Sequence, residues 1–577
     1  MCGIVGMILR EEFTNTELLK ALKGLEYRGY DSVGYATVEG ILQKDVGEID
    51  NFVKTLPEKK TKAAISHTRW ATHGGVTQAN AHPHASCHNT LYLVHNGIIE
   101  NYESLREELL TQGHEFASET DSEVIAHFIE QKIKEGLTIT EAIESFIKVA
   151  KGTYAVLLLP RGEEKIYAFK KDSPLVLGIL PEGHMVSSDI YAFSDRSQKA
   201  IFFEDYEMAV ITPDGYSFYK DGALITKEIK EFNVQFTEIE KDFPHYMIKE
   251  IHEQPLVAER LITSLHNEQK PVLEKLADLM RKSRKVVFVA AGTSYHASLL
   301  GVHFFHNIGV ETQTIIASEF KNYITCDENT LVIAISQSGE TMDVLKALKY
   351  AKAQGAHIAS IVNVPYSTIQ RMSALSLEIL AGQEICVAST KTYTNQVVTL
   401  LALAQQFGYT VTLDTISERI KECITTHEKK VQELAKTLKD KHDIYLIGRG
   451  LSYPVARESA LKLKEISYVH AEGMMGGELK HGTIALVEDG TPVVCLIPDE
   501  DYEMESNTRE VQARGAHTII ISNNAVFRPD FLLNTASDGK FAVLATIIGQ
   551  MLAYYIAKER GLPIDKPRNL AKSVTVE

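Results

Sequence analysis

Two different hydrophobic patterns divide the chain of 577 residues. In residues 1–225, short strand-like runs such as 34–37 and 154–158 recur, with helical periodicity between them, as at 122–132. This mixture predicts an α+β domain of layered sheets. After residue 245, longer helical patterns alternate with short apolar strands, which predicts α/β doubly wound sheets.

The second region repeats itself. FVAAGTSY at 288–295 resembles LIGRGLSY at 446–453, and AKAQGAHIASIVN at 351–363 resembles VQARGAHTIIISN at 511–523. The offsets of 158 and 160 residues are nearly equal, so we expect a tandem duplication of one α/β domain. The expected organisation is a first domain, a linker, two α/β domains and a C-terminal tail, at residues 2–225, 226–245, 246–420, 421–567 and 568–577.

Charge and cysteine usage exclude several classes of protein. The net charge of −16 argues against a partner that is nucleic acid or an anionic membrane. The six cysteines include no CxxC pair, which disfavours zinc ribbons and a disulfide framework. No signal peptide is recognised at the start, so we expect a cytoplasmic protein. The apolar stretch 541–557 is too short for a membrane span and is interpreted as a buried helix.

A cysteine follows the initiator methionine. Removal of Met1 would give Cys2 a thiol and a free α-amine on one residue. An α-amine of pKa about 7.7 is neutral in roughly one molecule in three near neutral pH, whereas a lysine of pKa about 10.4 is neutral in roughly one in a thousand. Cys2 therefore has the composition of an N-terminal nucleophile that carries its own base. The alternative is an incidental cysteine at the second position.

A turn rich in hydroxyl groups follows one of the apolar strands. SQSGET at 336–341 offers backbone N–H groups, hydroxyls and a helix N-terminus, which together favour a phosphate group. The corresponding turn of the second copy, PDEDYE at 498–503, carries carboxylates that would repel phosphate. We therefore expect one phosphate site per chain, with GTS at 292–294 beside it. The alternative for each turn is helix capping by Ser or Thr.

Two further patterns bear on chemistry. Six histidines lie within residues 67–95, but Pro83 interrupts them and no HxxxH helix or companion Cys/Asp pattern supports a metal site. VHNGIIEN at 94–101 places Asn96 and Gly97 after an apolar strand, where a side-chain amide and a backbone N–H can form an oxyanion hole. The alternative for Asn96-Gly97 is a type I′ hairpin turn.

Several sequence blocks carry a family resemblance. CGIVG, LEYRGYDS, HTRWATHG, NAHPH, VHNGIIEN and SETDSEVIAH resemble the class II glutamine amidotransferase domain, an N-terminal-nucleophile hydrolase. GTSY, SQSGET, VASTKTYTNQ, ALKLKEISYVHAEG, GELKHG and KPRNLAKSVTVE resemble paired sugar isomerase (SIS) domains. In this order, the blocks resemble the glucosamine-6-phosphate synthase family from residue 2 to residue 577. The implied fold is an α+β four-layer hydrolase domain followed by two α/β doubly wound SIS domains.

In the first domain, the resemblance implies that Cys2 attacks glutamine, while Arg28 supports the chain terminus. Asn96 and Gly97 would stabilise the oxyanion. The residues implied to bind glutamine surround this nucleophile; besides Arg28 they are Arg69 for the α-carboxylate, Asp121 for the α-ammonium, Thr72 and His73 for the pocket wall, and Trp70 as the gate between the active sites.

In the second region, the resemblance implies a sugar-phosphate site. Its binding residues are Ser336, Gln337, Ser338 and Thr341 for the phosphate, and Thr293, Ser294, Val387, Ala388 and Ser389 for the sugar. Lys572 would form a Schiff base, Glu465 would move a proton between C1 and C2, and Lys462 would support it. His481 would open the sugar ring from a neighbouring subunit. The alternative for Lys462 and Glu465 is a surface ion pair at spacing i, i+3.

The implied reaction joins glutamine and fructose 6-phosphate to give glucosamine 6-phosphate and glutamate. It calls for no metal and no nucleotide or redox cofactor, and we expect a homodimer with a shared active site. We weighed two other classes. Another class II amidotransferase would need a pyrophosphate loop and magnesium ligands, which we do not find, and a sugar-phosphate sensor would not need Cys2, Glu465 and Lys572 together.

Overall fold

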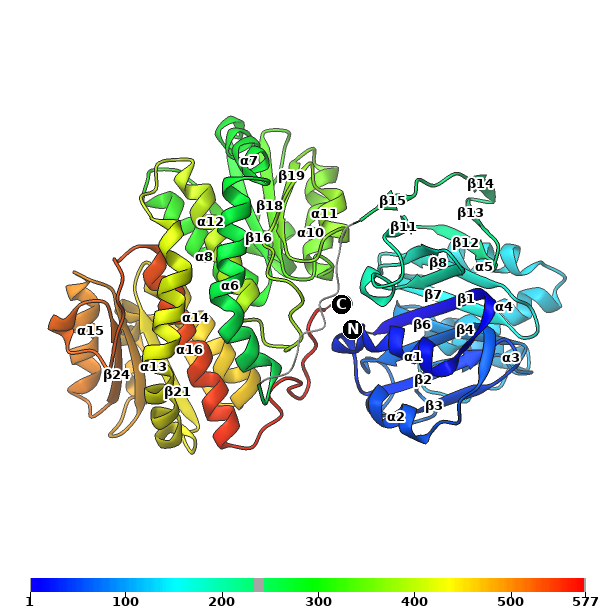
Figure 1. Ribbon diagram of the computed structural model, residues 1–577, viewed down its shortest axis with the longest axis horizontal. Helices are drawn as coiled ribbons and strands as arrows, with labels where there is room; N and C mark the ends of the chain where they lie inside the picture. Colours follow the sequence, from blue (N-terminus) through cyan, green and yellow to red (C-terminus); the bar gives the residue numbers. More distant parts are fainter. Residues whose placement is uncertain (1, 233–242, 575–577) are drawn as a thin grey trace. The chain divides into compact units, whose positions relative to one another are not determined.

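The computed structural model describes residues 2–232 and 243–574, which form two units (Figure 1). The first unit extends to residue 232, and the second runs from residue 243 to Lys572. The predicted linker at 226–245 lies partly outside the described residues. Its first part contains the short strand β15 (Lys230–Glu231), which pairs with the edge strand β11 of the first unit.

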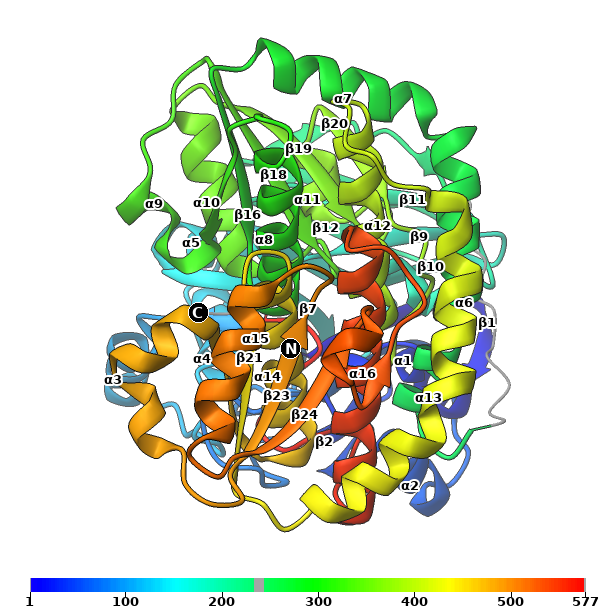
Figure 2. The same ribbon diagram turned by 90° about the vertical axis from the view of Figure 1, so that its left-hand side faces the viewer.

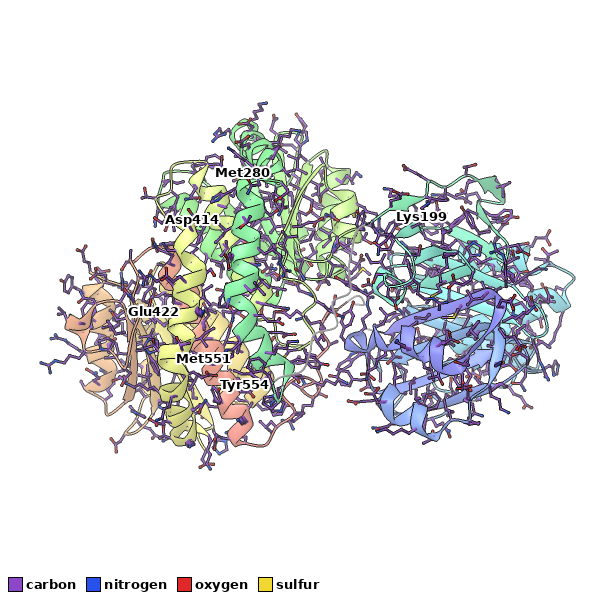
Figure 3. The ribbon with its side chains drawn as sticks, in the orientation of Figure 1. Lys199, Met280, Asp414, Glu422, Met551 and Tyr554 are labelled. Carbon is purple, nitrogen blue, oxygen red and sulfur yellow. The ribbon has the colours of Figure 1, made fainter. Side chains whose placement is uncertain are left out.

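The first unit contains two antiparallel sheets. One has the order β15-β11-β9-β10-β1-β4-β2-β3, and the other has the order β14-β13-β12-β8-β7-β6-β5. The strands are β1 (Gly3–Thr14), β2 (Ser32–Thr37), β3 (Leu42–Val46), β4 (Lys60–Arg69), β5 (His84–Ala85), β6 (Leu91–Ile99), β7 (Gly152–Pro160), β8 (Ile166–Lys171), β9 (Val176–Leu180), β10 (Gly183–Ser187), β11 (Lys199–Phe202), β12 (Glu207–Ile211), β13 (Tyr216–Lys220) and β14 (Ala223–Ile225). Figure 3 labels Lys199 at the start of β11.

Helices cover the outer faces of these two sheets. They are α1 (Asn15–Lys23), α2 (Ile49–Thr55), α3 (Tyr102–Thr111), α4 (Glu123–Lys134) and α5 (Ile139–Val149). Buried side chains such as Ile4, Ile65 and Leu157 form one core between the sheets. Ile125, Phe146 and other residues of the helices pack against the far side of β6 and β7 in a second core. The α+β four-layer prediction is confirmed.

The second unit contains two parallel sheets. They have the orders β17-β16-β18-β19-β20 and β22-β21-β23-β24-β25, so both follow the order 2-1-3-4-5 of a doubly wound fold. The strands are β16 (Lys285–Ala290), β17 (Gln313–Ile316), β18 (Thr330–Ser336), β19 (His357–Val362), β20 (Leu375–Glu378), β21 (Asp443–Gly448), β22 (His470–Met475), β23 (Pro492–Ile497), β24 (His517–Ser522) and β25 (Phe531–Leu532). The identical strand order agrees with the expected duplication.

A layer of helices lies between the two parallel sheets; Figure 1 shows α6, α13 and α16 in this layer, and Figure 2 shows α13 beside α16. The helices of the unit are α6 (Tyr246–His266), α7 (Lys270–Lys282), α8 (Gly292–His306), α9 (Phe320–Tyr323), α10 (Met342–Ala353), α11 (Thr368–Met372), α12 (Lys391–Gln405), α13 (Ile416–Leu438), α14 (Ser452–Lys462), α15 (Tyr502–Gln512) and α16 (Gly539–Glu559). One core joins the inner faces of both sheets to this layer. The proposed border at residues 420 and 421 falls inside α13, which is continuous.

Helix α16 contains the apolar stretch noted in the sequence. It is long and apolar enough to cross a membrane by composition alone, but 94% of its most apolar window is buried inside the protein. Figure 3 labels Met551 and Tyr554 on this helix, and both side chains lie in the core of the second unit. The interpretation of residues 541–557 as a buried helix is therefore confirmed.

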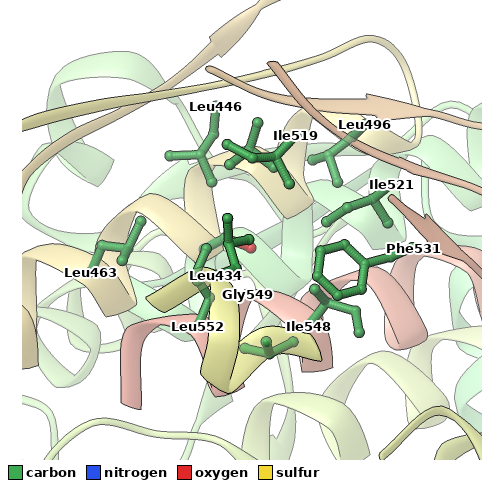
Figure 4. A pocket seen from close by; sticks show the side chains of 13 residues that line it. Leu434, Leu446, Leu463, Leu496, Ile519, Ile521, Phe531, Ile548, Gly549 and Leu552 are labelled. Carbon is green, nitrogen blue, oxygen red and sulfur yellow. The ribbon is translucent and has the colours of Figure 1, made fainter. Parts of the chain in front are cut away.

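A small cavity lies where α16, α13 and α14 meet the second parallel sheet (Figure 4). It is lined by hydrocarbon side chains, including Leu446, Ile521 and Phe531, and by Ser459. A phosphorylated sugar requires charged or hydroxyl partners, which this lining does not supply. We interpret the cavity as a packing defect and look for the active sites elsewhere.

Candidate active sites

Cys2 lies at the start of β1, where the chain enters the first sheet. Its Sγ accepts a hydrogen bond from the backbone N–H of Trp70 at 3.2 Å, and its carbonyl oxygen accepts one from Asn96 Nδ2 at 2.9 Å. Burial raises the pKa of the Cys2 thiol, while the Trp70 N–H and the Arg69 guanidinium act in the opposite direction. A raised thiol pKa makes a nearby base necessary for attack at neutral pH.

Asn96 and Gly97 lie within strand β6, paired with Ala155 and Tyr154 of β7. The alternative of a type I′ hairpin turn is therefore wrong. Gly97 has a φ of 136°, and a Cβ added there would lie 2.0 Å from the carbonyl oxygen of Thr153, so no other residue fits. The Asn96 amide has two N–H groups and uses one on Cys2, so the other remains for an oxyanion.

Opposite charges lie near the nucleophile. Arg69 ends β4 and donates to the carbonyl oxygens of His73, Gly74 and Gly75 in the following loop. Burial lowers its pKa, and the negative charges at Cys2, Asp31 and Asp121 counteract this shift. Free amino acids carry an ammonium and a carboxylate, so a guanidinium and a carboxylate in the same neighbourhood suit their recognition.

Asp121 and His73 are each held by one neighbouring element. An Asp121 oxygen accepts from the backbone N–H of Ile99 at 2.8 Å, at the end of β6. The His73 ring packs edge-on against Tyr102, with 5.7 Å between ring centroids. Thr72 lies exposed in the same loop. The structure therefore brings Cys2, Trp70, Asn96, Arg69 and Asp121 together and leaves Thr72 at the solvent edge.

Arg28 is buried near the start of the chain. Its Nη2 lies 2.5 Å from Asp189 Oδ2, and the hydroxyl of Tyr27 donates to the same oxygen at 3.0 Å. Asp189 was not among the residues predicted from the sequence. It lies 161 residues away, and no local pattern marks it as a partner.

Four buried histidines form a stack beside this site. The rings of His67 and His82 are stacked at 4.1 Å, His84 packs edge-on against His82 at 4.5 Å, and His95 donates its backbone N–H to His82 Nδ1 at 3.2 Å. Burial lowers the pKa of all four, that of His67 to about 3. The stack is therefore uncharged at neutral pH, and its contacts are those of a structural core.

The turn after β18 gathers three hydroxyl groups. Thr341 Oγ1 lies 3.4 Å from Ser336 Oγ and 3.5 Å from Ser338 Oγ, and Ser336 Oγ accepts the Gly339 backbone N–H at 3.0 Å. Gly339 has a φ of 65°, and a Cβ there would lie 2.0 Å from Ser367 Oγ. Thr341 precedes α10 but its side chain makes no capping hydrogen bond, so the capping alternative is wrong for this hydroxyl.

The corresponding turn of the second copy is occupied by acidic side chains. Asp501 caps α15 by accepting the Met504 backbone N–H at 2.9 Å, and Asp499 accepts from Asn524 at 2.6 Å. In the second copy a carboxylate caps the helix that follows the turn. In the first copy the Thr341 hydroxyl makes no such capping hydrogen bond. The two turns therefore differ in charge at equivalent places of the same fold.

Lys462 and Glu465 form an ion pair where α14 passes into a π-helical turn (Leu463–Ser467), and the Glu465 side chain is 19% exposed. Lys462 Nζ lies 2.5 Å from Glu465 Oε2 and 3.0 Å from the Thr293 hydroxyl, and its side chain is 0% exposed. The alternative of a surface ion pair is therefore wrong. Burial raises the pKa of Glu465, and the Lys462 charge opposes the rise.

Glu458 is a second carboxylate at this site. It accepts from Thr293 Oγ1 at 3.1 Å, lies 2.8 Å from His296 Nδ1, and lies 3.4 Å from Lys462 Nζ. These contacts tie α8 of the first copy to α14 of the second. Ser294, the next residue of α8, accepts from Gln396 Nε2 at 2.9 Å.

The Lys572 side chain is completely buried. Its Nζ donates to a Glu384 carboxylate oxygen, to the Cys386 carbonyl oxygen at 2.8 Å and to Ser389 Oγ at 3.2 Å. The buried amine therefore has a fully buried carboxylate as its ion-pair partner. Burial acts to raise the pKa of Glu384, yet Lys572 and hydrogen bonds from Thr390 and Thr392 hold it at about 2.

The comparisons with known proteins agree with this arrangement. A family model described as "SIS domain" matches residues 279–406 and 437–526, and one described as "Glutamine amidotransferase domain" matches residues 67–195. A protein of Thermococcus kodakarensis named glutamine–fructose-6-phosphate aminotransferase [isomerizing] is 43% identical over 612 aligned residues, which cover 100% of both chains. One of the same name from Aquifex aeolicus is 41% identical, also over 100% of both chains. The chain belongs to this aminotransferase family.

Two solved structures are similar to more than half of this chain. The C-terminal domain of glucosamine-fructose-6-phosphate aminotransferase from Francisella tularensis is 34% identical, with a TM-score of 0.52, and covers 57% of this chain and 100% of its own. The tagatose-6-phosphate ketose/aldose isomerase from Escherichia coli is 18% identical, with a TM-score of 0.51 over 57% of this chain and 98% of its own, and shares the fold.

Four further residues predicted from the sequence lie at three different places in the second unit. Val387 and Ala388 lie with Ser389 in the loop before α12, where the Val387 N–H donates to the Asp565 carbonyl at 3.0 Å. Gln337 follows β18 and accepts from a backbone N–H at 3.2 Å. His481 is exposed at the end of a 3-10 turn, and no hydrogen bond or ion pair joins it to Glu465 or Lys572 within the described part of the chain.

Three buried carboxylates of this aminotransferase-family chain were not predicted. Glu458 stands four residues before Lys462, so helical spacing could have indicated it. Glu384 lies 188 residues from its partner Lys572, and no sequence signal connects them. Burial and the charge of Glu384 raise the pKa of Glu250 to about 8, so Glu250 is protonated at neutral pH and accepts from the backbone N–H groups of Ile385 and Cys386.

Proposed function

We propose that this chain converts fructose 6-phosphate and glutamine to glucosamine 6-phosphate and glutamate. The observation that carries the proposal is the 43% identity, over the whole chain, to a relative whose name states this type of reaction. The geometry of both units supports it. The first unit offers a nucleophile with an oxyanion donor, and the second offers a hydroxyl-lined turn and the ion pair of Lys462 with Glu465.

The first half-reaction uses Cys2. After removal of Met1, the α-amine takes the thiol proton and Sγ attacks the glutamine carboxamide carbon. Asn96 and Gly97 stabilise the oxyanion, the C–N bond breaks, and the nitrogen leaves as ammonia. Water then hydrolyses the thioester to glutamate and frees the thiol. Arg28 supports the chain terminus through its contacts with Tyr27 and Asp189.

The amino-acid end of glutamine determines its orientation. Arg69 pairs with the α-carboxylate and Asp121 with the α-ammonium, while His73 and Thr72 border the pocket and Trp70 covers it. The negative charge of Asp121 close to a buried arginine supports this assignment, because both ends of a zwitterion then meet an opposite charge.

In the second unit, the sugar phosphate binds at the turn after β18. Ser336, Ser338 and Thr341 donate hydroxyls to the phosphate, and Gln337 adds its side-chain amide. The sugar lies against five residues near Lys462 and Lys572, namely Thr293, Ser294, Val387, Ala388 and Ser389. The contact of Lys462 with Thr293 supports this placement of the sugar.

The second half-reaction is amination followed by isomerisation. Lys572 forms an imine at C2 of the open-chain sugar with loss of water, ammonia then displaces the lysine amine, and a fructosimine results. Glu465 moves a proton from C1 to C2 while the C1 hydroxyl proton passes to the imine nitrogen, which gives the amino-aldose, and Lys462 keeps the Glu465 carboxylate ionised. We assign ring opening to His481 of a second subunit, because His481 is exposed and unconnected to Glu465 in its own chain. This implies a homodimer, which we place in the cytoplasm.

The test is mass spectrometry of the products formed from fructose 6-phosphate and glutamine labelled with ¹⁵N in the amide. The proposal expects labelled glucosamine 6-phosphate and unlabelled glutamate in equal amounts. A matched reaction with the Cys2→Ala variant should give no labelled amino sugar. Glutamate without amino sugar from the wild-type chain, or amino sugar without label, would contradict the proposal.

A further inference from the structure

A compact cluster of metal-ligating side chains lies in the first unit, outside the proposed glutaminase site. It consists of Cys87 between β5 and β6, His114 between α3 and α4, and His127 and Glu130 on α4. Their ligand atoms lie within 4.8 Å of one another. His114, His127 and Glu130 are each at most 5% exposed, and Cys87 is partly buried.

The distances between these atoms are those of a tetrahedral coordination shell. Cys87 Sγ lies 3.4 Å from His114 Nδ1 and 3.3 Å from His127 Nδ1, the two Nδ1 atoms are 3.3 Å apart, and His114 Nδ1 lies 3.5 Å from Glu130 Oε2. Zinc bonds of ordinary length at tetrahedral angles place two nitrogens about 3.3 Å apart, and sulfur and nitrogen about 3.6 Å apart.

In each of the two imidazole rings, the hydrogen-bond partner of Nε2 shows which ring nitrogen carries the hydrogen. His114 Nε2 lies 3.1 Å from Gln131 Oε1, and the amide nitrogen of Gln131 donates to Glu135 at 3.1 Å, which fixes the oxygen toward His114. His127 Nε2 lies 3.4 Å from a carboxylate oxygen of Glu123. Each Nε2 therefore carries the hydrogen, and each Nδ1 turns a lone pair inward.

The inward-facing atoms are thus two nitrogen lone pairs, a sulfur and a carboxylate oxygen. The Cys87 Sγ also accepts the Glu115 backbone N–H at 3.4 Å. The Nζ of Lys134, whose side chain is 45% exposed, lies 3.4 Å from Glu130 Oε2, whereas a cation at the centre of the cluster would meet all four ligand atoms at once.

We propose that Cys87, His114, His127 and Glu130 bind one Zn²⁺ ion. A mixed Cys, His and carboxylate set suits zinc, whereas Mg²⁺ and Ca²⁺ prefer oxygen ligands alone. Four protein ligands fill the tetrahedron and leave no position for substrate, so the ion is structural. We expected no metal from the sequence, because the histidines between 67 and 95 match no metal motif, and none of those histidines belongs to this cluster.

The position of the ion gives it a role that does not depend on the proposed reaction. Asp121 lies two residues before α4, which supplies two ligands, and β6, which carries Asn96, begins four residues after Cys87. The ion would tie the middle of α4 to the start of β6. Loss of the ion should therefore loosen the first unit and leave the fold of the second unit unchanged.

The first experiment measures metal in the full chain purified without a metal-affinity step. Inductively coupled plasma mass spectrometry should find close to one zinc per chain after extensive dialysis. The chain stripped with a chelator should then take up Co²⁺, with the visible bands of a tetrahedral site and the near-ultraviolet charge-transfer band of a cobalt–thiolate bond. A stripped chain that binds neither Zn²⁺ nor Co²⁺ stoichiometrically would overturn the proposal.

Variants identify the ligands. Cys87→Ser should abolish the charge-transfer band, and His114→Gln should lower the retained zinc at least tenfold. His88→Gln is the matched control, because His88 is exposed, lies next to Cys87 and is not in the cluster. Retention of zinc and of the cobalt–thiolate band by Cys87→Ser would assign the metal elsewhere. Because the cobalt spectrum is read on the wild-type chain, a variant that fails to fold does not decide the question.

Discussion

The ammonium group of Lys462 lies 2.5 Å from a carboxylate oxygen of Glu465, and the lysine side chain is fully buried. The structure therefore pairs a candidate proton carrier with a fixed positive charge in a place that water does not reach freely. Burial alone would keep the Glu465 carboxyl protonated, because it raises the pKa, and Lys462 limits that rise.

Replacing Lys462 by methionine should move the pH dependence of isomerisation. Without the ammonium group the pKa of Glu465 rises, so the base is ionised only at higher pH. We expect the acidic limb of the kcat profile to move up by about 1 to 3 pH units. Steady-state isomerisation of fructose 6-phosphate from pH 5 to pH 9 measures it. Lys464→Met, at an exposed neighbouring position, is the control, and an unmoved limb in Lys462→Met would contradict the assignment.

Cys2→Ala should abolish glutamine hydrolysis and leave sugar-phosphate isomerisation largely intact. The reason is that the nucleophile and the Lys462–Glu465 pair lie in separate units with separate cores. Glutamate release and glucose 6-phosphate formation are assayed in parallel, with Cys326→Ala as the control. An equal loss of both activities would contradict the assignment of the two reactions to separate units. Detection of Met1 in the mass of the intact protein would exclude the α-amine of Cys2 as the base.

Removal of two hydroxyls at the turn after β18 should weaken sugar-phosphate binding. Each hydrogen bond to a charged group is worth about 1.5–3 kcal/mol, so Ser336→Ala with Thr341→Ala should raise the KM for fructose 6-phosphate about a hundredfold or more. The KM for glutamine serves as the internal reference. The double variant Ser417→Ala with Thr415→Ala, at the start of α13, is the control. A crystal soaked with phosphate that shows the ion beside Asp499 would refute the choice of turn.

Deletion of residues 568–577 should stop amino-sugar formation while glutamine hydrolysis continues at a reduced rate. The tail supplies Lys572, and its loss leaves the buried Glu384 carboxylate without its cation. Borohydride added with fructose 6-phosphate should trap an adduct on Lys572, located by peptide mass spectrometry. Lys566→Ala is the control for general loss of amines near the tail. An adduct on another lysine, or product from the truncated chain, would defeat the assignment.

Glu250 should make the protein less stable as pH rises. Its pKa in the folded state is about 8, above that of an exposed glutamate, so the folded chain binds more protons than the unfolded chain between about pH 4.5 and pH 8. Stability therefore falls through this range, by at most about 1.4 kcal/mol per pH unit. Glu250→Gln should remove this loss, which thermal unfolding at fixed scan rate would show as a smaller drop in Tm from pH 6 to pH 8. Glu253→Gln, one turn along α6, is the control, and an unchanged drop in Glu250→Gln would contradict the prediction.

The layers of both units followed from sequence because they depend on local periodicity. Alternating residues gave the strands of the first unit, and the near-constant offset between repeats gave two sheets of equal strand order. The hydroxyl turn could be found for the same reason, since its residues are consecutive. From the sequence, Asn96-Gly97 could form either an oxyanion hole or a hairpin turn. Only the folded structure, in which the Thr153 carbonyl oxygen of β7 lies against Gly97, shows that a glycine is needed inside the strand.

The sequence did not predict which charged residues contact one another in the interior of the protein. Asp189, Glu384 and Glu250 act on residues far along the chain, and a glutamate that will be buried looks the same as one that will be exposed. The Cys87 cluster was missed for a related reason. Its ligands come from a strand connection, a loop and a helix, so their spacing of 27, 13 and 3 residues matches no regular motif.

The helical layer of the second unit has a consequence for its evolutionary origin. A single ancestral copy of the repeat would have exposed the apolar face that α6, α13 and α16 now share with both sheets. Such a face is stable in water only when a second copy covers it, which points to an ancestor that worked as a pair of identical chains. Neither half can be expressed alone without recreating that exposed face.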